Sequence, residues 1–127
     1  MVDSGLVEIG SHTLTHPILS SVTDEVSENE LVTSRAEIEE GIGRTVRYFC
    51  FPNGQVGDYR LSQVQQVRDV GYEGAVAARP GMVICGSDPY DLPRIGVSGR
   101  SGMLNFSKHL DGVEHYQAKI QRALGSA

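Results

Sequence analysis

Short hydrophobic runs alternate along this chain with amphipathic segments and with clusters of glycine, proline and polar residues. β-Branched and aromatic runs bounded by turn residues favour buried strands. We expect four such strands, over residues 6–10, 46–51, 74–78 and 92–97. Apolar residues recurring every three or four positions predict helices over residues 23–42, 61–70, 103–110 and 113–124. Residues 83–91 show neither pattern and predict a loop.

The longest predicted helix, over residues 23–42, has a clear start and a clear stop. Acidic residues near its beginning favour the positive end of the helix dipole. Ser27 and Glu30 have the spacing of a capping box, so a start at Ser27 is an alternative. Gly41 and Gly43 supply the stop. We expect one buried face on this helix, formed by Leu31, Ser34, Ile38 and Ile42.

The alternation of strands and helices predicts an α/β fold with parallel strands and flanking helices. The length of 127 residues fits a single domain, residues 1–127, with terminal helices over 103–127. Functional groups in such folds lie on the loops that leave the carboxyl ends of the strands. Two unusual loops follow strands, SHTLTHP at 11–17 and FPNGQ at 51–55, and we expect them to open on the same side.

Composition narrows the classes of function. The net charge of -5 argues against a general nucleic-acid binder and against a polybasic membrane-surface module. No apolar run has the length of a membrane span, and the N-terminus does not have the pattern of a signal peptide, so the sequence indicates no compartment. Cys50 and Cys85 match no CxxC motif, and we expect two small, buried apolar side chains.

His12 and His16 are the sharpest chemical feature. Two imidazoles four residues apart converge on one divalent metal ion if the loop forms a helical turn. A pair of ordinary loop histidines is the alternative interpretation. A metal site needs at least one further ligand, and the conceivable carboxylates, each more typical of a solvated or capping residue, are Glu8, Asp24 and Asp58.

The second loop offers a different chemistry. Proline and glycine in Phe51–Gln55 shape a tight turn that can aim a backbone N–H outward to stabilise an oxyanion, although a plain strand-to-helix turn has the same composition. Arg94 lies between apolar neighbours, where it either forms a structural ion pair or orients an active-site carboxylate. His109 and His115 read as surface or packing residues.

Three segments in this order resemble the polysaccharide deacetylase family, the carbohydrate esterases with a NodB homology domain. They are GSHTLTHP (10–17), YFCFPNG (48–54) and LPRIGV (92–97). The resemblance implies a distorted (β/α) barrel that hydrolyses N- or O-acetyl groups of polysaccharides with a divalent metal, usually zinc. It implies that His12 and His16 are metal ligands.

The resemblance also assigns roles to the second loop. It implies that the Asn53 backbone N–H is the oxyanion donor and that the turn forms one wall of a groove for acetylated polysaccharide, with Phe51, Pro52 and Gly54. Resemblance to a divergent subgroup without the family's arginine and late histidine implies that Arg94 takes over some of the positioning.

The chain departs from the family pattern in several places. The first family motif, Thr-Phe-Asp-Asp-Gly, supplies the catalytic base and the third metal ligand and has no counterpart here, and the family's tryptophan and late histidine motifs are also missing. Cys50 stands where an arginine is frequent. We therefore expect the C-terminal part of a deacetylase, an incomplete barrel that is inactive by itself and self-associates through exposed edges. A non-catalytic carbohydrate-binding or scaffold module of the same ancestry is the alternative.

Overall fold

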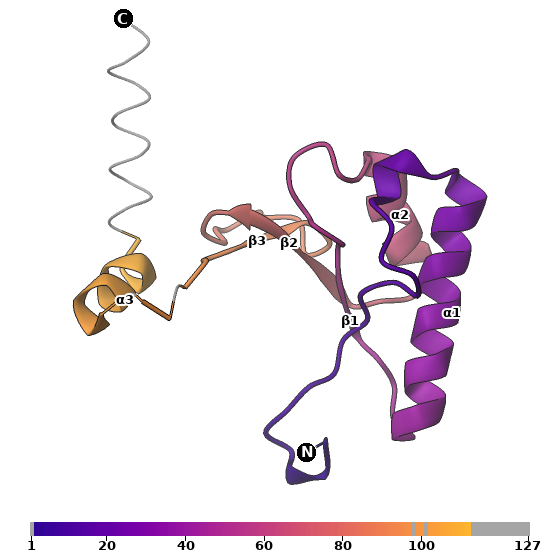
Figure 1. The fold of residues 1–127 in the computed structure, drawn as a ribbon, viewed down its shortest axis with the longest axis horizontal. Coiled ribbons are helices and arrows are strands. Elements are labelled where there is room, and N and C mark those ends of the chain that lie inside the picture. The colour runs from indigo at the N-terminus through magenta and orange to yellow at the C-terminus, as the bar shows by residue number, and fades with distance from the viewer. Residues whose placement is uncertain (1, 98, 101, 113–127) are drawn as a thin grey trace, which may run out of the picture.

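The computed structural model describes residues 2–97, 99–100 and 102–112, in which three parallel strands form one sheet. Their order in the sheet is β1 (Tyr48–Cys50), β2 (Gly74–Pro80) and β3 (Leu92–Arg94). The helices α1 (Asp24–Ile42) and α2 (Leu61–Asp69) lie together on one side of the sheet, and α3 (Met103–Leu110) lies beyond β3 (Figure 1). The predicted α/β class, with parallel strands and flanking helices, is confirmed, and the barrel is incomplete.

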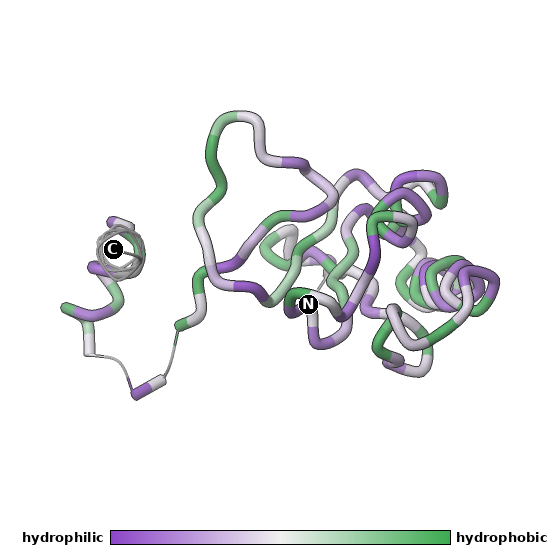
Figure 2. Tube along the Cα trace, turned by 90° about the horizontal axis from the view of Figure 1, so that it is seen from above, coloured by the Kyte–Doolittle hydropathy of each residue, from purple (hydrophilic) through white to green (hydrophobic). Residues whose placement is uncertain are grey.

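Helix α1 begins and ends where its capping residues predict. The Thr23 hydroxyl accepts a hydrogen bond from the Val26 N–H, and Gly43 ends the helix with a left-handed φ of 64°. The alternative start at Ser27 is wrong, because Ser27 is buried within the helix and donates to the Gln66 side chain of α2 at 2.7 Å. Figure 2, which views α1 nearly along its axis, shows hydrophilic residues on the side facing away from the sheet.

The hydrophobic core fills the space between α1, α2 and the sheet. The predicted face of α1 is confirmed, with Leu31 and Ser34 buried and Ile38 and Ile42 packed against the core. Apolar side chains from all these elements meet there, and burying them is the main source of stability in a domain of this size. The buried members are Leu19, Leu31, Val46, Phe49, Phe51, Val64, Val67, Tyr72 and Ala75.

The predicted strand over residues 6–10 is not formed. The bridge residue at this place is Ser11, directly after the segment, which pairs in parallel with Phe49 of β1. This register places residues 6–9 opposite residues 44–47, which precede β1 and are not a strand themselves. Without a ladder partner the segment is mostly exposed, and Leu6 is 90% exposed. A hydrophobic run is therefore not enough to make a buried strand.

The other predicted elements differ mainly at their ends. The strands over 46–51 and 92–97 are shorter than predicted, the strand from Gly74 is longer, and the helices from residues 61 and 103 are confirmed. Residues 83–91 contain no helix or strand, as predicted. The predicted helix over 113–124 lies outside the described residues. No helix in the described ranges is both long and apolar enough to cross a membrane.

Candidate metal-binding and oxyanion site

The first candidate loop leaves the sheet at Ser11, beside β1. The Ser11 N–H donates to the Tyr48 carbonyl and the Cys50 N–H donates to the Ser11 carbonyl, each at 2.9 Å. Thr13 and His16 both adopt left-handed backbone conformations, with φ of 68° and 59°. The loop is therefore not the helical turn considered for the His-x-x-x-His spacing, and the two histidine rings lie together in a loop with two left-handed residues instead.

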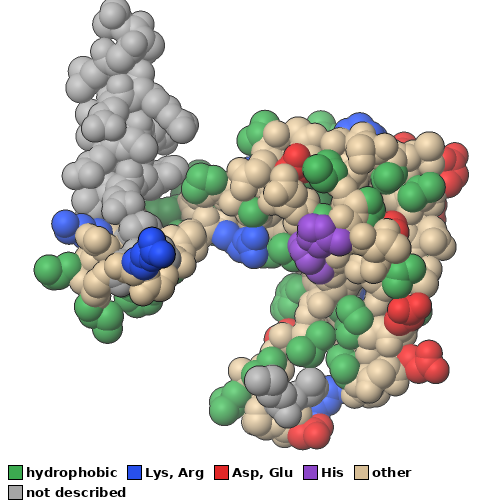
Figure 3. Space-filling view, viewed as in Figure 1, with side chains coloured by type: hydrophobic (Ala, Val, Ile, Leu, Met, Phe, Trp, Pro, Cys, Tyr) green, Lys and Arg blue, Asp and Glu red, His purple; other side chains and the backbone are tan. Residues whose placement is uncertain are grey.

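The two histidine rings lie edge to face on the exposed surface of the molecule (Figure 3). Their centroids are 4.8 Å apart and their planes are inclined at 72°. The Nδ1 atom of His12 lies 2.7 Å from the Cys50 carbonyl oxygen. A carbonyl only accepts hydrogen bonds, so Nδ1 carries the proton in this contact, and Nε2 is the nitrogen that has a lone pair in the neutral form of the ring.

This arrangement fits a shared divalent metal ion. A Zn–N bond is about 2.0–2.1 Å long, so two imidazoles bound to one ion at a tetrahedral angle have ring centres about 5 Å apart. The separation of 4.8 Å agrees with that value. A backbone carbonyl that fixes the tautomer of a ligand histidine is also a common outer-shell feature of metal sites.

The three carboxylates considered as a further ligand are engaged elsewhere. Glu8 pairs with Arg47 and Asp24 pairs with Arg60. Asp58 accepts hydrogen bonds within the second loop. In the part of the chain that the structure describes, no three side chains of the ligand types gather at one place. Of the ligand types, the described residues thus bring only the two histidines together at this place.

Glu30 of α1 holds the first candidate loop, residues 11–17, which we call the histidine loop, and its sequence pattern did not predict this role. Its carboxylate accepts hydrogen bonds from the N–H groups of Leu14 and Thr15, at 2.7 and 2.8 Å, and from the Thr15 hydroxyl at 2.5 Å. Burial raises the pKa of this carboxyl, but the three hydrogen bonds outweigh that effect and hold the pKa below its usual value. The one feature of the sequence that could have indicated this role is that Glu30 directly precedes Leu31, a residue of the predicted buried face.

The second candidate loop is built on the buried end of β1. Phe51 stacks on Tyr59 with centroids 4.0 Å apart, and both Phe51 and Pro52 are buried. Gly54 has a φ of 65°, and a Cβ placed on it would lie 2.6 Å from the Ala78 backbone nitrogen. Phe51, Pro52 and Gly54, which the resemblance assigned to the wall of a groove, are therefore buried, and the exposed residues of the turn are Asn53 and Gln55.

Asn53 occupies the exposed tip of this turn. Its φ is 58°, and its side-chain amide donates to Asp58 at 2.7 Å. Asp58 also accepts from the Gln55 N–H at 2.8 Å, so one carboxylate braces both residues. Among the described residues, none accepts a hydrogen bond from the Asn53 backbone N–H.

Arg94 is the last residue of β3, at the carboxyl end of the parallel sheet. Its Nε donates to the Ala77 carbonyl at 2.9 Å, and within the described ranges it has no carboxylate partner, so the expected ion pair is absent there. Burial raises the pKa of the Cys50 thiol, and the positive charge of Arg94 partly opposes that shift. Cys50 is half-buried, whereas Cys85 is exposed in a turn, which corrects the expectation of two buried cysteines.

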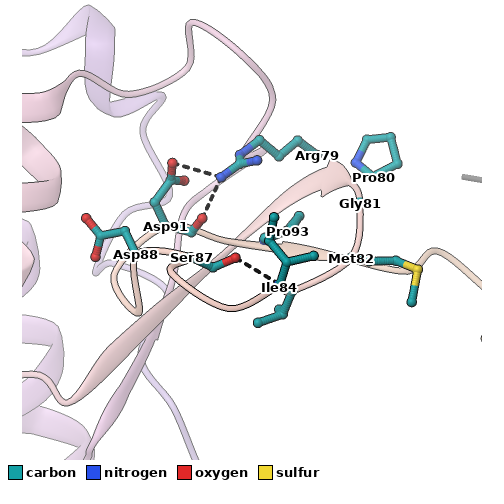
Figure 4. Close-up of a pocket in the computed structure, with 10 residues that line it drawn as sticks. Arg79, Pro80, Gly81, Met82, Ile84, Ser87, Asp88, Asp91 and Pro93 are labelled. Carbon is teal, nitrogen blue, oxygen red and sulfur yellow. Dashed lines mark hydrogen bonds and ion pairs between the residues drawn. The ribbon is translucent and has the colours of Figure 1, made fainter. Parts of the chain in front are cut away.

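A cavity of about 520 Å³ lies beside the end of β2 (Figure 4). Arg79 reaches across it to Asp91, with a nitrogen–oxygen distance of 2.8 Å. The Tyr59 hydroxyl donates to the same carboxylate at 2.6 Å. Ile84 and Pro93 form part of the apolar wall of this cavity. Sequence reasoning gave this segment no chemical role.

The fold and the two loops define an α/β protein with two neighbouring histidines and an exposed turn at Asn53 near the carboxyl end of a parallel strand. The sequence profile of the family described as polysaccharide deacetylase matches residues 1–75, more than half of the chain and both loops. The chain therefore belongs to the polysaccharide deacetylase family. Comparison with curated protein sequences gave no match.

Solved structures share this fold. The deacetylase PplD of Streptococcus pyogenes, in complex with acetate, matches with a TM-score of 0.72 and 19% identity over 79% of this chain and 43% of that chain. The polysaccharide deacetylase BC0361 of Bacillus cereus matches with a TM-score of 0.74 and 24% identity over 85% of this chain and 33% of that chain. A de-N-acetylase from Aggregatibacter actinomycetemcomitans matches with a TM-score of 0.68 and 18% identity over 86% of this chain and 50% of that chain. The chain thus spans half or less of the length of these proteins.

Proposed function

We propose that this chain contributes the two-histidine part of a zinc site, together with an oxyanion donor, to the hydrolysis of acetyl groups on acetylated polysaccharide. The observation that carries the proposal is the pairing of His12 and His16, with ring centroids 4.8 Å apart and the His12 tautomer set by the Cys50 carbonyl. Family membership supplies the substrate class.

A bound divalent metal supplies Lewis acidity and lowers the pKa of a coordinated water, so that a nucleophile is available near neutral pH. His12 and His16 would hold the metal. His12 is suited to this role because its Nδ1–H bond to the Cys50 carbonyl orients the ring and leaves Nε2 free.

The Asn53 backbone N–H would donate to the oxygen that becomes negative when water adds to the acetyl carbonyl. The left-handed conformation of Asn53 and the bracing carboxylate of Asp58 hold this donor in place before substrate arrives. Gly54 supports the turn from below by its close approach to β2. Arg94 would contribute positive charge at the same edge and help to position groups there.

The sequence contains no Asp-Asp pair, which the family uses as catalytic base and further metal ligand. We therefore infer that the 127 residues by themselves do not hydrolyse acetyl groups. The open sheet, with β3 at one edge and a single bridge at Ser11 on the other, leaves backbone groups unpaired, and we infer self-association through these edges. Light scattering tests this inference, and a monomer at high concentration contradicts it.

Calorimetric titration with zinc tests the metal site. We expect one zinc ion per chain or per assembly, with binding lost in the double variant His12→Ala/His16→Ala. The matched control is His109→Ala/His115→Ala, which removes the other two histidines of the sequence and is expected to bind normally. Equal binding by all three proteins overturns the proposal. Binding of acetylated polysaccharide without histidine-dependent zinc binding supports a carbohydrate-binding module instead.

A further inference from the structure

The histidine loop is tied to α1 at two places. At its start, the Ser11 and Ser34 hydroxyls form a buried hydrogen bond of 2.7 Å. Midway between the histidines, Glu30 accepts the three hydrogen bonds from Leu14 and Thr15 described above. Glu30 is only 5% exposed, so α1 presents its carboxylate to the loop from the interior.

The loop needs such an anchor because its backbone is strained on both sides of the anchored residues. Thr13 lies in the left-handed region with a φ of 68°, which a β-branched residue rarely adopts, and His16 lies there with a φ of 59°. Strained conformations of this kind persist only when the surrounding contacts over-determine them. Leu14 and Thr15, whose N–H groups Glu30 holds, lie between the two strained positions.

We propose that Glu30 is a positioning residue of the metal site, whose carboxylate holds the loop in the conformation that brings His12 and His16 together. This inference rests on the proposed metal-binding function. Glu30 makes no recorded contact with either histidine and acts only through Leu14 and Thr15.

The chemistry of the contact predicts an order among variants. Alanine removes all three acceptor interactions and frees the loop. Glutamine keeps one oxygen, which accepts the two N–H groups, and its amide can donate to the Thr15 hydroxyl once that group rotates to accept. We therefore expect Glu30→Gln to restore most of the geometry that Glu30→Ala loses. Glu28→Ala is the matched control, because Glu28 is an exposed glutamate on the same helix.

The test combines zinc calorimetry with the ¹⁵N imidazole spectrum of the metal-free protein. We expect zinc affinity to fall about 10- to 100-fold in Glu30→Ala, as for other outer-shell changes, by a few-fold in Glu30→Gln and not at all in Glu28→Ala. We also expect the His12 resonances, which report the Nδ1–H bond to Cys50, to shift or broaden in Glu30→Ala.

Each outcome decides the proposal. Unchanged zinc affinity and unchanged imidazole resonances in a folded Glu30→Ala overturn it, even if that variant is less stable. If Glu30→Ala does not fold, Glu30→Gln decides by the same two measurements. If the wild-type chain shows no histidine-dependent zinc binding, the proposed function fails, and the imidazole spectrum alone then decides whether Glu30 positions the histidines.

Discussion

The two loops of the candidate site lie beside the same strand but are held in place by different means. The loop with His12 and His16 is fixed by side chains from another element, a carboxylate and a hydroxyl of α1. The loop with Asn53 combines a local contact with a tertiary one, because Asp58 lies five residues away whereas Gly54 approaches Ala78 of β2. The first loop therefore depends on contacts with a distant helix, whereas the second depends on local turn chemistry and on packing against β2.

The largest effect is expected where the second loop approaches β2. In Gly54→Ala the new Cβ lies 2.6 Å from the Ala78 nitrogen, and the alanine must adopt a φ of 65°. We expect a loss of about 3 kcal/mol in unfolding free energy, measured by urea denaturation. Gly41→Ala is the control, because its Cβ in α1 meets nothing within 4 Å and should stabilise by about 0.5–1 kcal/mol. Equal effects would show that the close approach is unimportant.

A smaller effect is expected where the first loop meets α1. Glu30→Ala leaves three donors of Leu14 and Thr15 without their acceptor, and water can replace it only in part. We expect a loss of about 2 kcal/mol in urea denaturation. Glu28→Ala should stay within about 0.5 kcal/mol of wild type. A loss as small as that in Glu30→Ala would mean that the loop does not depend on α1.

Acid should weaken the first loop selectively. The pKa of Glu30 is lowered from its ordinary value of 4.5, because its hydrogen bonds outweigh the raising effect of burial. The stabilisation by the ionised carboxylate is therefore complete above about pH 4.5 and is lost as the pH falls through the lowered pKa. We expect the stability difference between wild type and Glu30→Gln to shrink in that range. A difference that is independent of pH would contradict this assignment.

The smallest effect is expected at the tip of the second loop. Asn53→Ala loses the bond to Asp58 and places a Cβ residue without a polar side chain in the left-handed region, which costs about 1 kcal/mol. Asn53→Gly loses the same bond but tolerates the conformation, so its loss in urea denaturation should be smaller. Because both variants lose the same bond, an equal or larger loss in Asn53→Gly would show that the left-handed conformation costs Asn53→Ala nothing.

Local signals in the sequence were enough to predict most of the elements that build the fold. Thr23 and Gly43 mark the ends of α1, and the apolar positions of that helix form its buried face. The run at residues 6–10 misled the prediction, because hydrophobicity indicates burial but does not supply a neighbouring strand. The His-x-x-x-His spacing identified the right pair, although a helical turn was the wrong geometry.

The sequence by itself determined the α/β class, the order of the helices and parallel strands, the two histidines and the turn at Asn53, because capping, periodicity and turn chemistry act between neighbours along the chain. Only the tertiary structure decided which side chains support the site. Glu30 meets Leu14 and Thr15 across 16 and 15 residues, and His12 meets the Cys50 carbonyl across 38. Such contacts depend on the packing of α1 and β1 around a common core, which no local pattern encodes.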